Sequence, residues 1–294
     1  MVAIQDKGFG AMGKQSSSEI EHCTDILEKT RGLLVISGAG ISAESGIPTY
    51  RGPGGIYENN PGLPPMLSAE GLAKDPDRIW NHFNELRTLV AGAQPNPAHR
   101  ILAKWETEQR FPRMLIATQN IDGLHQKAGS GRVSELHGSM WQMACPRTVD
   151  YAEDEQFSDD FSEMMSSGGN ADILRRWSEE NNRTIWNDHQ VPFSTIPPYT
   201  DPAIRPNVLF FNEDYGNRLL WVEDFIRKGV DTVLVVGCSG GVAVLDRLLR
   251  QCRKENPACS IININPHQDC IEHAHTFIHM QAGSAMEQIQ TCLK

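Results

Sequence analysis

The chain has 294 residues, of which 39% are hydrophobic, and its formal net charge at pH 7 is -10. This length suits one large domain or two smaller ones, each with its own apolar core. The acidic balance argues against a general nucleic-acid-binding face, which needs clustered Lys and Arg side chains. No stretch approaches the roughly 18 consecutive apolar residues that a membrane-spanning helix needs. We therefore expect a globular protein that binds neither membranes nor nucleic acids directly.

The N-terminal segment and the cysteines bear on where the protein works. Residues 1–17 contain no apolar core of a secretory signal, and we expect them to form a disordered lead. The seven cysteines are an odd number, are irregularly spaced and include no C-x-x-C pair. Free thiols in a reducing compartment are the default for such a chain. An intracellular, cytoplasmic location is therefore expected.

Short apolar runs alternate with helical patterns along the chain. Ser18 opens the first helix with a capping box, because glutamate stands three residues later. Helical periodicity predicts further helices over 99–108, 221–228 and 244–254. Four runs have the pattern of parallel strands buried on both faces: residues 33–37, 114–117, 233–236 and 261–264. This alternation predicts an α/β fold with a Rossmann-type, doubly wound parallel sheet.

Two segments interrupt the alternation. Residues 53–97 are rich in Gly, Pro and Asn before a predicted helix around 77–90, and residues 145–200 are rich in acids, Ser and Gly. We interpret both as insertions that together form a second, smaller domain. The larger domain then comprises residues 18–52, 98–144 and 201–294.

The stretch GAGISAESGIPTYRG, residues 38–52, follows the first predicted strand. Its glycines permit a tight turn and a close approach to phosphate, and a helix starting there would direct free N–H groups at an anion. The third glycine, Gly46, does not stand at the spacing of the dinucleotide fingerprint. The glycines alone therefore leave two interpretations equally open, a phosphate cradle and a structural turn.

Three further motifs place polar residues near the ends of predicted strands. The segment TQNIDGLH, residues 118–125, can bond a ribose or an amide where ligands of open α/β sheets bind, or it can form an Asx turn and a helix cap. The segment ELHGS, residues 135–139, presents a histidine suited to proton transfer near neutral pH. The segment VVGCSGG, residues 235–241, repeats the arrangement of a strand followed by glycines.

In this order and at these spacings, the four motifs resemble the sirtuin family of NAD-dependent protein deacylases. The resemblance covers roughly residues 30–145 and 203–266. It implies that NAD and the acylated lysine of a protein or peptide meet in a cleft between the two domains. Nicotinamide, free lysine and O-acyl-ADP-ribose are the implied products, and a ribose hydroxyl loses its proton to the catalytic base.

The same resemblance implies a role for individual residues. His137 matches the catalytic base, and Asn120 and Asp122 are its companions in catalysis. Phe211, Asn212 and Glu213 match an edge strand that pairs with the substrate backbone, with Asn212 standing where the family has glycine. The residues that match NAD contacts are Gly38, Ala39, Gly40, Ser42, Tyr50, Arg51, Gln119, Ile121, Gly237, Ser239 and Asn263; the family usually has phenylalanine at the position of Tyr50.

Two departures from the family pattern stand out. Sirtuins usually hold a structural zinc with two C-x-x-C pairs, whereas Cys145 here has Thr148 in place of its partner and no cysteine lies between 146 and 237. A tetrahedral site needs four such ligands, so we expect no metal. The class III branch, which the Ala-Glu-Ser segment resembles, holds acidic acyl groups with Tyr-x-x-Arg. Phe83 and Leu86 occupy those positions here, and Arg87 stands one position late, about 100° further around a helix.

These departures leave three functions open, and the missing anion holder favours a neutral acyl group or a non-peptide substrate. The first function is a zinc-independent NAD-dependent lysine deacylase. The second is an ADP-ribosyltransferase or NAD hydrolase on the same scaffold, since the altered regions are those that present the peptide. The third is a non-catalytic NAD-binding regulator, against which the intact set of Gln119, Asn120, Asp122 and His137 speaks.

Overall fold

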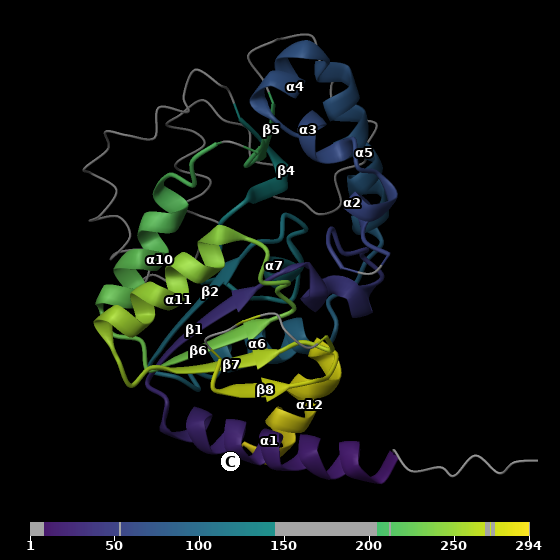
Figure 1. Ribbon diagram of the computed structural model, residues 1–294. Coiled ribbons are helices and arrows are strands. Elements are labelled where there is room, and N and C mark those ends of the chain that lie inside the picture. The colour runs from purple at the N-terminus through teal and green to yellow at the C-terminus, as the bar shows by residue number, and fades with distance from the viewer. Residues whose placement is uncertain are drawn as a thin grey trace, which may run out of the picture.

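A computed structural model describes residues 9–52, 54–144, 205–211, 213–267, 271 and 274–293. A central sheet has helices on both faces, and a group of short helices with a small second sheet lies beyond one end of it (Figure 1). The central sheet has six strands, all parallel: β1 (Gly32–Ser37), β2 (Arg113–Thr118), β3 (Val133–Glu135), β6 (Thr232–Val236), β7 (Ser260–Ile264) and β8 (Thr276–Ile278).

The strand order is β3-β2-β1-β6-β7-β8. The chain therefore runs outward from β1 to one edge, returns to the middle at β6 and continues to the other edge. Such a reversal is a topological switch point, where the loops after the two central strands separate and leave a crevice. The predicted Rossmann-type sheet is confirmed, and its crevice must lie at the carboxyl ends of β1 and β6.

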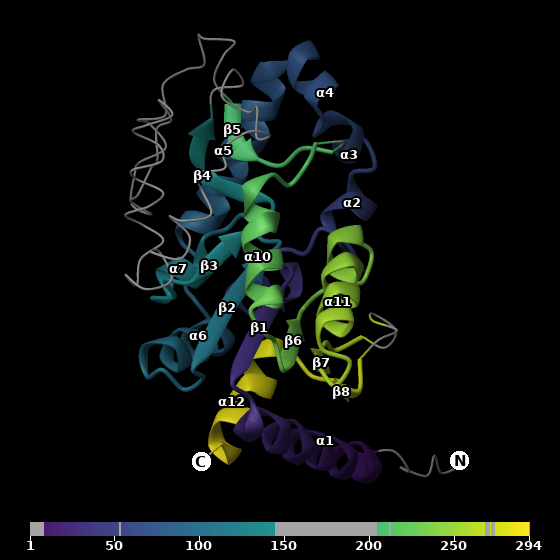
Figure 2. The same ribbon diagram turned by 90° about the vertical axis from the view of Figure 1, so that its left-hand side faces the viewer.

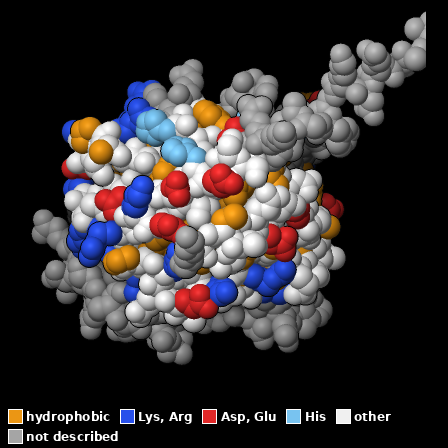
Figure 3. Space-filling view, turned by 90° about the horizontal axis from the view of Figure 1, so that it is seen from below, with side chains coloured by type: hydrophobic (Ala, Val, Ile, Leu, Met, Phe, Trp, Pro, Cys, Tyr) orange, Lys and Arg blue, Asp and Glu red, His pale blue; other side chains and the backbone are white. Residues whose placement is uncertain are grey.

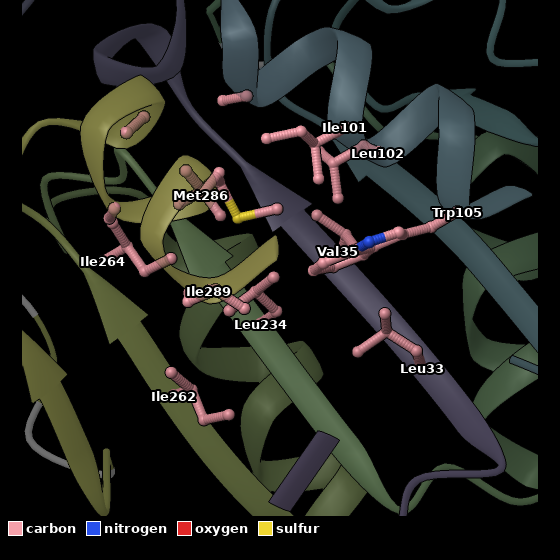
Figure 4. Packing of buried hydrophobic residues seen from close by; sticks show 14 of the residues in the cluster. Leu33, Val35, Ile101, Leu102, Trp105, Leu234, Ile262, Ile264, Met286 and Ile289 are labelled. Atoms are coloured by element: carbon pink, nitrogen blue, oxygen red, sulfur yellow. The ribbon is translucent and has the colours of Figure 1, made fainter. Parts of the chain in front are cut away.

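Alternating side chains of the strands build a core on each face of the sheet. Helices α1 (Phe9–Lys29), α6 (Pro97–Thr107) and α12 (Ala282–Cys292) cover one face, where Trp105 and Met286 pack against Val35 and Leu234 (Figure 4). Helices α10 (Asn217–Arg227) and α11 (Ala243–Glu255) cover the other face. All six residues of β1 are buried, as expected for a central strand with helices on both sides.

A smaller module forms a third apolar cluster above the carboxyl end of the sheet (Figures 1 and 2). It contains α2 (Ile56–Asn59), α3 (Leu63–Met66), α4 (Ala69–Lys74) and α5 (Pro76–Ala91), together with β4 (Gly138–Ala144) and β5 (Arg205–Val208), which pair antiparallel. The sequence-based boundaries assigned β4 and β5 to the larger domain. They pair with each other and pack on α5, so that assignment was wrong for these two strands.

Other differences from the sequence prediction concern ends and short elements. Helix α1 begins at Phe9, within the segment predicted to be a disordered lead. Strands β3 and β8 have three residues each, too few for a recognisable apolar run. The acidic insertion, residues 145–200, lies outside the described residues, as does Asn212.

The outer surface carries charges of both signs. On the face shown in Figure 3, acidic and basic side chains are interspersed and no large field of one sign is visible. Among the described residues, no helix has the length and apolar character needed to cross a membrane.

Candidate active site

A cavity of about 860 Å³ opens at the switch point of the sheet and extends under the smaller module. Its floor comes from the loops that follow β1, β2 and β6. Its far wall comes from Phe83 in α5 and from residues 208–211, which begin at the last residue of β5. Volumes of this size are typical of small-molecule and cofactor sites. One cavity thus joins a glycine-rich end on the sheet to an apolar end in the smaller module.

The glycines after β1 and β6 allow two backbone loops to touch. A Cβ atom on Gly40 would lie 2.8 Å from the Cα of Gly237, and one on Gly38 would lie 2.8 Å from its carbonyl oxygen. Gly237 itself has a φ of 64°, a left-handed conformation that favours glycine. The sequence prediction assigned these glycines to a close approach of phosphate. These glycines do line the cavity. Their absent side chains also allow the loops after β1 and β6 to contact each other directly.

The helix expected after the glycines is the seven-residue 3₁₀ helix η1 (Ala39–Ser45), which ends at Gly46 with a φ of 82°. Asn96 holds η1 from outside, because its Nδ2 donates to the Ile41 carbonyl oxygen at 2.6 Å and to the Ser45 Oγ at 3.0 Å. The short 3₁₀ geometry provides less alignment of peptide dipoles than an α-helix would. Side chains and individual N–H groups must therefore supply much of any anion contact.

The loop after β2 brings Gln119, Asn120 and Ile121 to the cavity. The Asn120 backbone N–H donates to the Thr118 Oγ1 at 3.1 Å, and its Nδ2 donates to the Gly38 carbonyl oxygen at 3.2 Å. Gln119 contacts the Cys238 sulfur through its Nε2 at 3.7 Å. This loop is therefore bonded to both glycine loops. These bonds fix the side chains of Gln119, Asn120 and Ile121 around the same part of the cavity.

Ser42 and Asp122 form a buried pair behind that loop. The Ser42 Oγ donates to the Asp122 Oδ2 at 2.7 Å, and the Leu124 N–H donates to its Oδ1 at 2.9 Å. Burial raises the pKa of Asp122, and these two hydrogen bonds act in the opposite direction. The sequence prediction gave both residues direct roles. Neither lines the cavity, so the pair supports Asn120 from behind.

His137 lies on the cavity wall between β3 and β4. Burial lowers its pKa to about 4, with Arg218 acting in the same direction and a hydrogen bond to the Gln119 backbone opposing it. The imidazole is therefore neutral at pH 7, and one of its ring nitrogens carries a lone pair that can accept a proton. Tyr215 lies beside it, with ring centroids 5.7 Å apart. This is the arrangement a general base requires.

Aromatic side chains enclose the entrance between the two ends of the cavity. The rings of Tyr50 and Tyr57 are 5.3 Å apart and those of Tyr57 and Phe211 are 6.2 Å apart, while the Arg51 guanidinium lies 5.5 Å from the Tyr57 ring. Burial, then Tyr57 and Asp122, raise the pKa of the Tyr50 phenol, which stays neutral. No sequence motif indicated that Tyr57 would lie at the cavity, because it belongs to the Gly- and Pro-rich insertion, away from the four motifs.

The apolar end contains no basic side chain of α5. Phe83 lines it, whereas Leu86 packs into the cluster of the smaller module. Arg87 is buried and donates from Nε to the Met140 carbonyl oxygen at 2.5 Å. The expectation that Arg87 does not replace the missing anion holder is consistent with this placement, because its guanidinium bonds the Met140 carbonyl oxygen and Arg87 does not line the cavity.

Other predicted residues divide between the cavity and the surrounding structure. Ser239, Phe211 and Glu213 line it, and among the described residues of this segment Phe211 forms an isolated bridge with Ser68. Asn263, predicted to contact the adenosine part of NAD, is buried within β7 and does not line the cavity. Asn265, two residues later, lies beyond the strand end, donates to the Cys238 carbonyl oxygen at 2.8 Å and lines the cavity.

Cavity residues that the sequence missed are Glu44, Tyr57, Tyr215, Asn265 and Gln281.

The fold and this site define the class of protein. A crevice at the switch point of a Rossmann-type sheet, floored by glycine loops and joined to an apolar pocket with a neutral histidine, belongs to nucleotide-binding proteins with a second substrate. Within the described ranges, no three His, Cys, Asp or Glu side chains are grouped as metal ligands.

The family is shown by sequence. Residues 38–244 match the model of the Sir2 family, and the chain belongs to that family, the sirtuins. It is 32% identical to an NAD-dependent protein deacylase of Thermococcus sibiricus over 94% of this chain and 96% of that protein. It is 30% identical to the mitochondrial NAD-dependent protein deacylase sirtuin-5 of Xenopus tropicalis, over 82% of this chain and 75% of that one.

Solved structures agree with this assignment. A mutant Sir2 homologue in complex with ADP-ribose superposes with a TM-score of 0.72 at 27% identity, covering 92% of this chain and 96% of the other. A Sir2 homologue in complex with NAD gives a TM-score of 0.71 at 26% identity, covering 92% and 93%. The predicted fold and family are therefore confirmed.

Proposed function

We propose that this sirtuin is an NAD-dependent protein-lysine deacylase that releases nicotinamide and O-acyl-ADP-ribose. The observation that carries the proposal is one cavity in which a neutral His137 stands between the Gln119–Ile121 loop and an apolar pocket. NAD supplies the electrophilic ribose carbon when it is bound. The NAD-dependent activity named for the relatives supports the same reaction.

The residues present fit NAD. Gly38, Gly40 and Gly237 keep the cradle free of side chains, since a Cβ atom on any of them would collide with the opposite loop. Asn120 and Gln119 offer amide groups for ribose or carboxamide recognition, and Arg51 brings a cation to the entrance. Ser239 and Asn265 lie at the other end of the cradle, where the adenosine part would lie.

The chain's own residues then have separate tasks. Asn120 orients the ribose, supported by Ser42 and Asp122. His137 accepts a proton from a ribose hydroxyl through the ring nitrogen that carries its lone pair. Tyr50 and Tyr57 exclude water from the entrance with neutral phenols.

We further propose that the acyl group is neutral. Phe83 lines the pocket where an acidic acyl group would need an arginine and a phenol, and Arg87 is bonded to Met140 instead. A carboxylate placed among Phe83, Val208 and Phe210 would lose its hydration without gaining a charged partner.

We also propose that the enzyme works without zinc. Segment 145–200 offers one cysteine, Cys145, and one histidine, His189, whereas a structural zinc site takes four Cys or His ligands. The cysteines that the structure describes are free, which supports an intracellular, reducing environment.

The test measures nicotinamide release from NAD with and without a mixed pool of acyl-lysine peptides, with mass analysis of the products. We expect release that depends on peptide and yields O-acyl-ADP-ribose. His137→Ala should lower that rate by roughly 10²- to 10⁴-fold, and His22→Ala, an exposed histidine of α1, serves as the matched control. Release without peptide, or ADP-ribosylated protein as the product, would replace this proposal with NAD hydrolysis or ADP-ribosyl transfer.

A further inference from the structure

Arg87 is an unusual residue for the interior of the smaller module. Its side chain is only 3% exposed, yet its contacts within the described part of the chain include no carboxylate. A buried guanidinium normally has an ionic partner, because removing it from water costs several kcal/mol. A charge placed there without such a partner calls for another explanation.

Within the described part of the chain, the contacts of this guanidinium are with neutral groups. Nε donates to the Met140 carbonyl oxygen at 2.5 Å, Nη1 donates to the Asn84 Oδ1 at 3.1 Å, and the group lies 5.5 Å from the Trp80 ring centroid. Burial lowers the pKa of Arg87 to about 10, so the side chain still carries its charge at pH 7. The bond to Met140 is therefore charge-assisted, a stronger class than a bond between neutral groups.

Met140 and its neighbour Trp141 are the attachment of β4 to the cavity loop. The Met140 N–H donates to the Ile121 carbonyl oxygen at 3.1 Å, and the Trp141 Nε1 donates to the Asp122 carbonyl oxygen at 2.8 Å. Gln119, Asn120 and Ile121 of the same loop line the cavity. A continuous set of hydrogen bonds thus runs from α5 through β4 to the loop.

We propose that Arg87 is a positioning residue for the 119–122 loop, acting through Met140 and Trp141 rather than through any contact with substrate. This role deepens the proposed function, since the loop is the part of the cavity assigned to the nicotinamide and ribose of NAD. A neutral replacement would leave the Met140 carbonyl without its donor and free β4 to shift. A displacement near 1 Å at a reacting group can cost about 10²-fold in rate.

The experiment compares Arg87→Met and Arg87→Lys with Asn84→Ala, the control that removes the other hydrogen bond of the guanidinium. Hydrogen exchange at the Met140 amide reports the link from β4 to Ile121 directly and requires no activity. NAD and nicotinamide affinities follow from calorimetry, kcat and KM from nicotinamide release, and melting temperature reports stability. Trp141→Phe removes the parallel link to Asp122 while keeping an aromatic ring.

We expect Arg87→Met to speed exchange at Met140 by about tenfold or more and to weaken nicotinamide and NAD binding. Arg87→Lys should fall between it and the wild type, and Asn84→Ala should match the wild type. The effects of Arg87→Met and Trp141→Phe on kcat/KM should be less than additive, because both variants loosen one loop.

A purely structural Arg87 would give a different result. Arg87→Met would then lower the melting temperature, while exchange at Met140 and NAD affinity stayed at wild-type values, and this outcome would overturn the proposal. If that variant fails to fold, wild-type exchange and affinity in both Arg87→Lys and Trp141→Phe would overturn it equally. A wild-type protein without peptide-dependent release would refute the proposed deacylase activity and leave the exchange result intact.

Discussion

The two ends of the cavity are built in opposite ways. At the sheet end, backbone meets backbone: the glycine loops after β1 and β6 approach so closely that a Cβ atom on Gly237 would lie 2.2 Å from the Ile41 nitrogen. At the other end, side chains make the wall, with Leu67, Phe83 and Phe210 from three separate segments. Substitutions at the sheet end would therefore clash with the opposite loop, whereas a substitution at the apolar end changes the shape and polarity of the wall.

This contrast indicates how one fold can keep its cofactor and change its second substrate. Backbone complementarity depends on the course of the chain, so a substitution there disturbs the whole loop. An apolar wall depends on the size and polarity of single side chains, and replacements of similar volume cost little. Cofactor binding should therefore be the sensitive property of this protein, and acyl selectivity the adjustable one.

The largest effect is expected from Gly237→Ala. The left-handed backbone, with a φ of 64°, and the 2.2 Å approach of the added Cβ both oppose this change. Left-handed strain costs about 1–2 kcal/mol and overpacking about 1–3 kcal/mol, so unfolding free energy should fall by roughly 3 kcal/mol. Chemical denaturation measures that loss, and calorimetry should show NAD binding abolished.

Gly46→Ala is the control for backbone strain alone. Gly46 also has a positive φ, 82°, but an added Cβ there would meet nothing within 4 Å. We expect a loss of about 1 kcal/mol with NAD affinity retained. If both variants lost the same unfolding free energy, the close contact between the two glycine loops would not contribute to stability. That result would contradict the description of the sheet end of the cavity as a backbone-to-backbone contact.

The next effect concerns the adjustable wall. Phe83→Tyr combined with Leu86→Arg would place a phenol and a guanidinium at the positions that the resemblance to class III sirtuins assigns to acidic acyl groups. A hydrogen bond to a charged group contributes about 1.5–3 kcal/mol. The ratio of kcat/KM for succinyl-lysine over acetyl-lysine peptides should therefore rise by roughly tenfold or more.

Its control is Phe83→Tyr with Leu86→Met, which adds the phenol but keeps an apolar side chain beside it. That variant should leave the succinyl to acetyl ratio near the wild-type value. NAD affinity should stay unchanged in both variants, because the sheet end is untouched. A ratio that does not move with arginine present would contradict the assignment of the acyl group to the Phe83 end.

The sequence predicted the sheet end better than the other end, for physical reasons. Buried parallel strands are continuous apolar runs, and loops after them need glycine, so residues 33–40 and 233–237 carry strong local signals. The wall at Phe83 and Phe210 arises from tertiary packing between distant segments, which no local pattern reports. Asn263 was assigned to NAD from the family resemblance, although it lies inside the predicted strand that ends at Ile264, and Asn265 beyond that end carried no motif. Ser42 and Asp122 were placed in the site because a motif names residues without showing which ones face the cavity.

A third effect follows from two histidines buried beneath the sheet end. The rings of His99 and His125 are 4.9 Å apart, and the Ser37 Oγ lies 2.9 Å from the His125 Nε2. Burial lowers the pKa of His99 to about 4, and burial together with His99 lowers that of His125. The unfolded chain, with histidine pKa values near 6.5, therefore binds more protons than the folded protein.

Stability should consequently decrease as pH falls below about 6.5, by roughly 1.4 kcal/mol per pH unit for each of the two histidines, until the folded pKa is reached. His99→Leu should reduce the measured slope by about 1.4 kcal/mol per pH unit between pH 6.5 and 4.5 in denaturation experiments, which is the contribution of one such histidine; His137, whose pKa burial also lowers to about 4, keeps its own contribution. His22→Leu, at an exposed position, should leave the slope unchanged. A slope in His99→Leu equal to that of the wild type would mean that the pair does not drive acid destabilisation.

The smallest effects compare two helix caps, one at each end of the cavity. Asn96 and Asp75 both cap a helix that begins with proline, and their side chains accept from the Ala98 N–H at 3.0 Å and the Arg78 N–H at 3.1 Å. Loss of a cap costs about 1 kcal/mol. Asp75→Ala should therefore lower unfolding free energy by that amount and leave catalysis unchanged.

Asn96→Ala should do more, because Asn96 also donates from Nδ2 to the Ile41 carbonyl oxygen at 2.6 Å and so holds η1 against α6. Each further hydrogen bond contributes about 1 kcal/mol, and the KM for NAD should rise as η1 loosens. Asn96→Asp separates the two roles, since a carboxylate still caps α6 but cannot donate to Ile41. If the KM for NAD of Asn96→Asp equals that of the wild type, Asn96 acts only as a helix cap. The glycine contacts alone would then hold the sheet end of the cavity in place. A raised KM for NAD in Asn96→Asp would show that side-chain hydrogen bonds also hold the cofactor end.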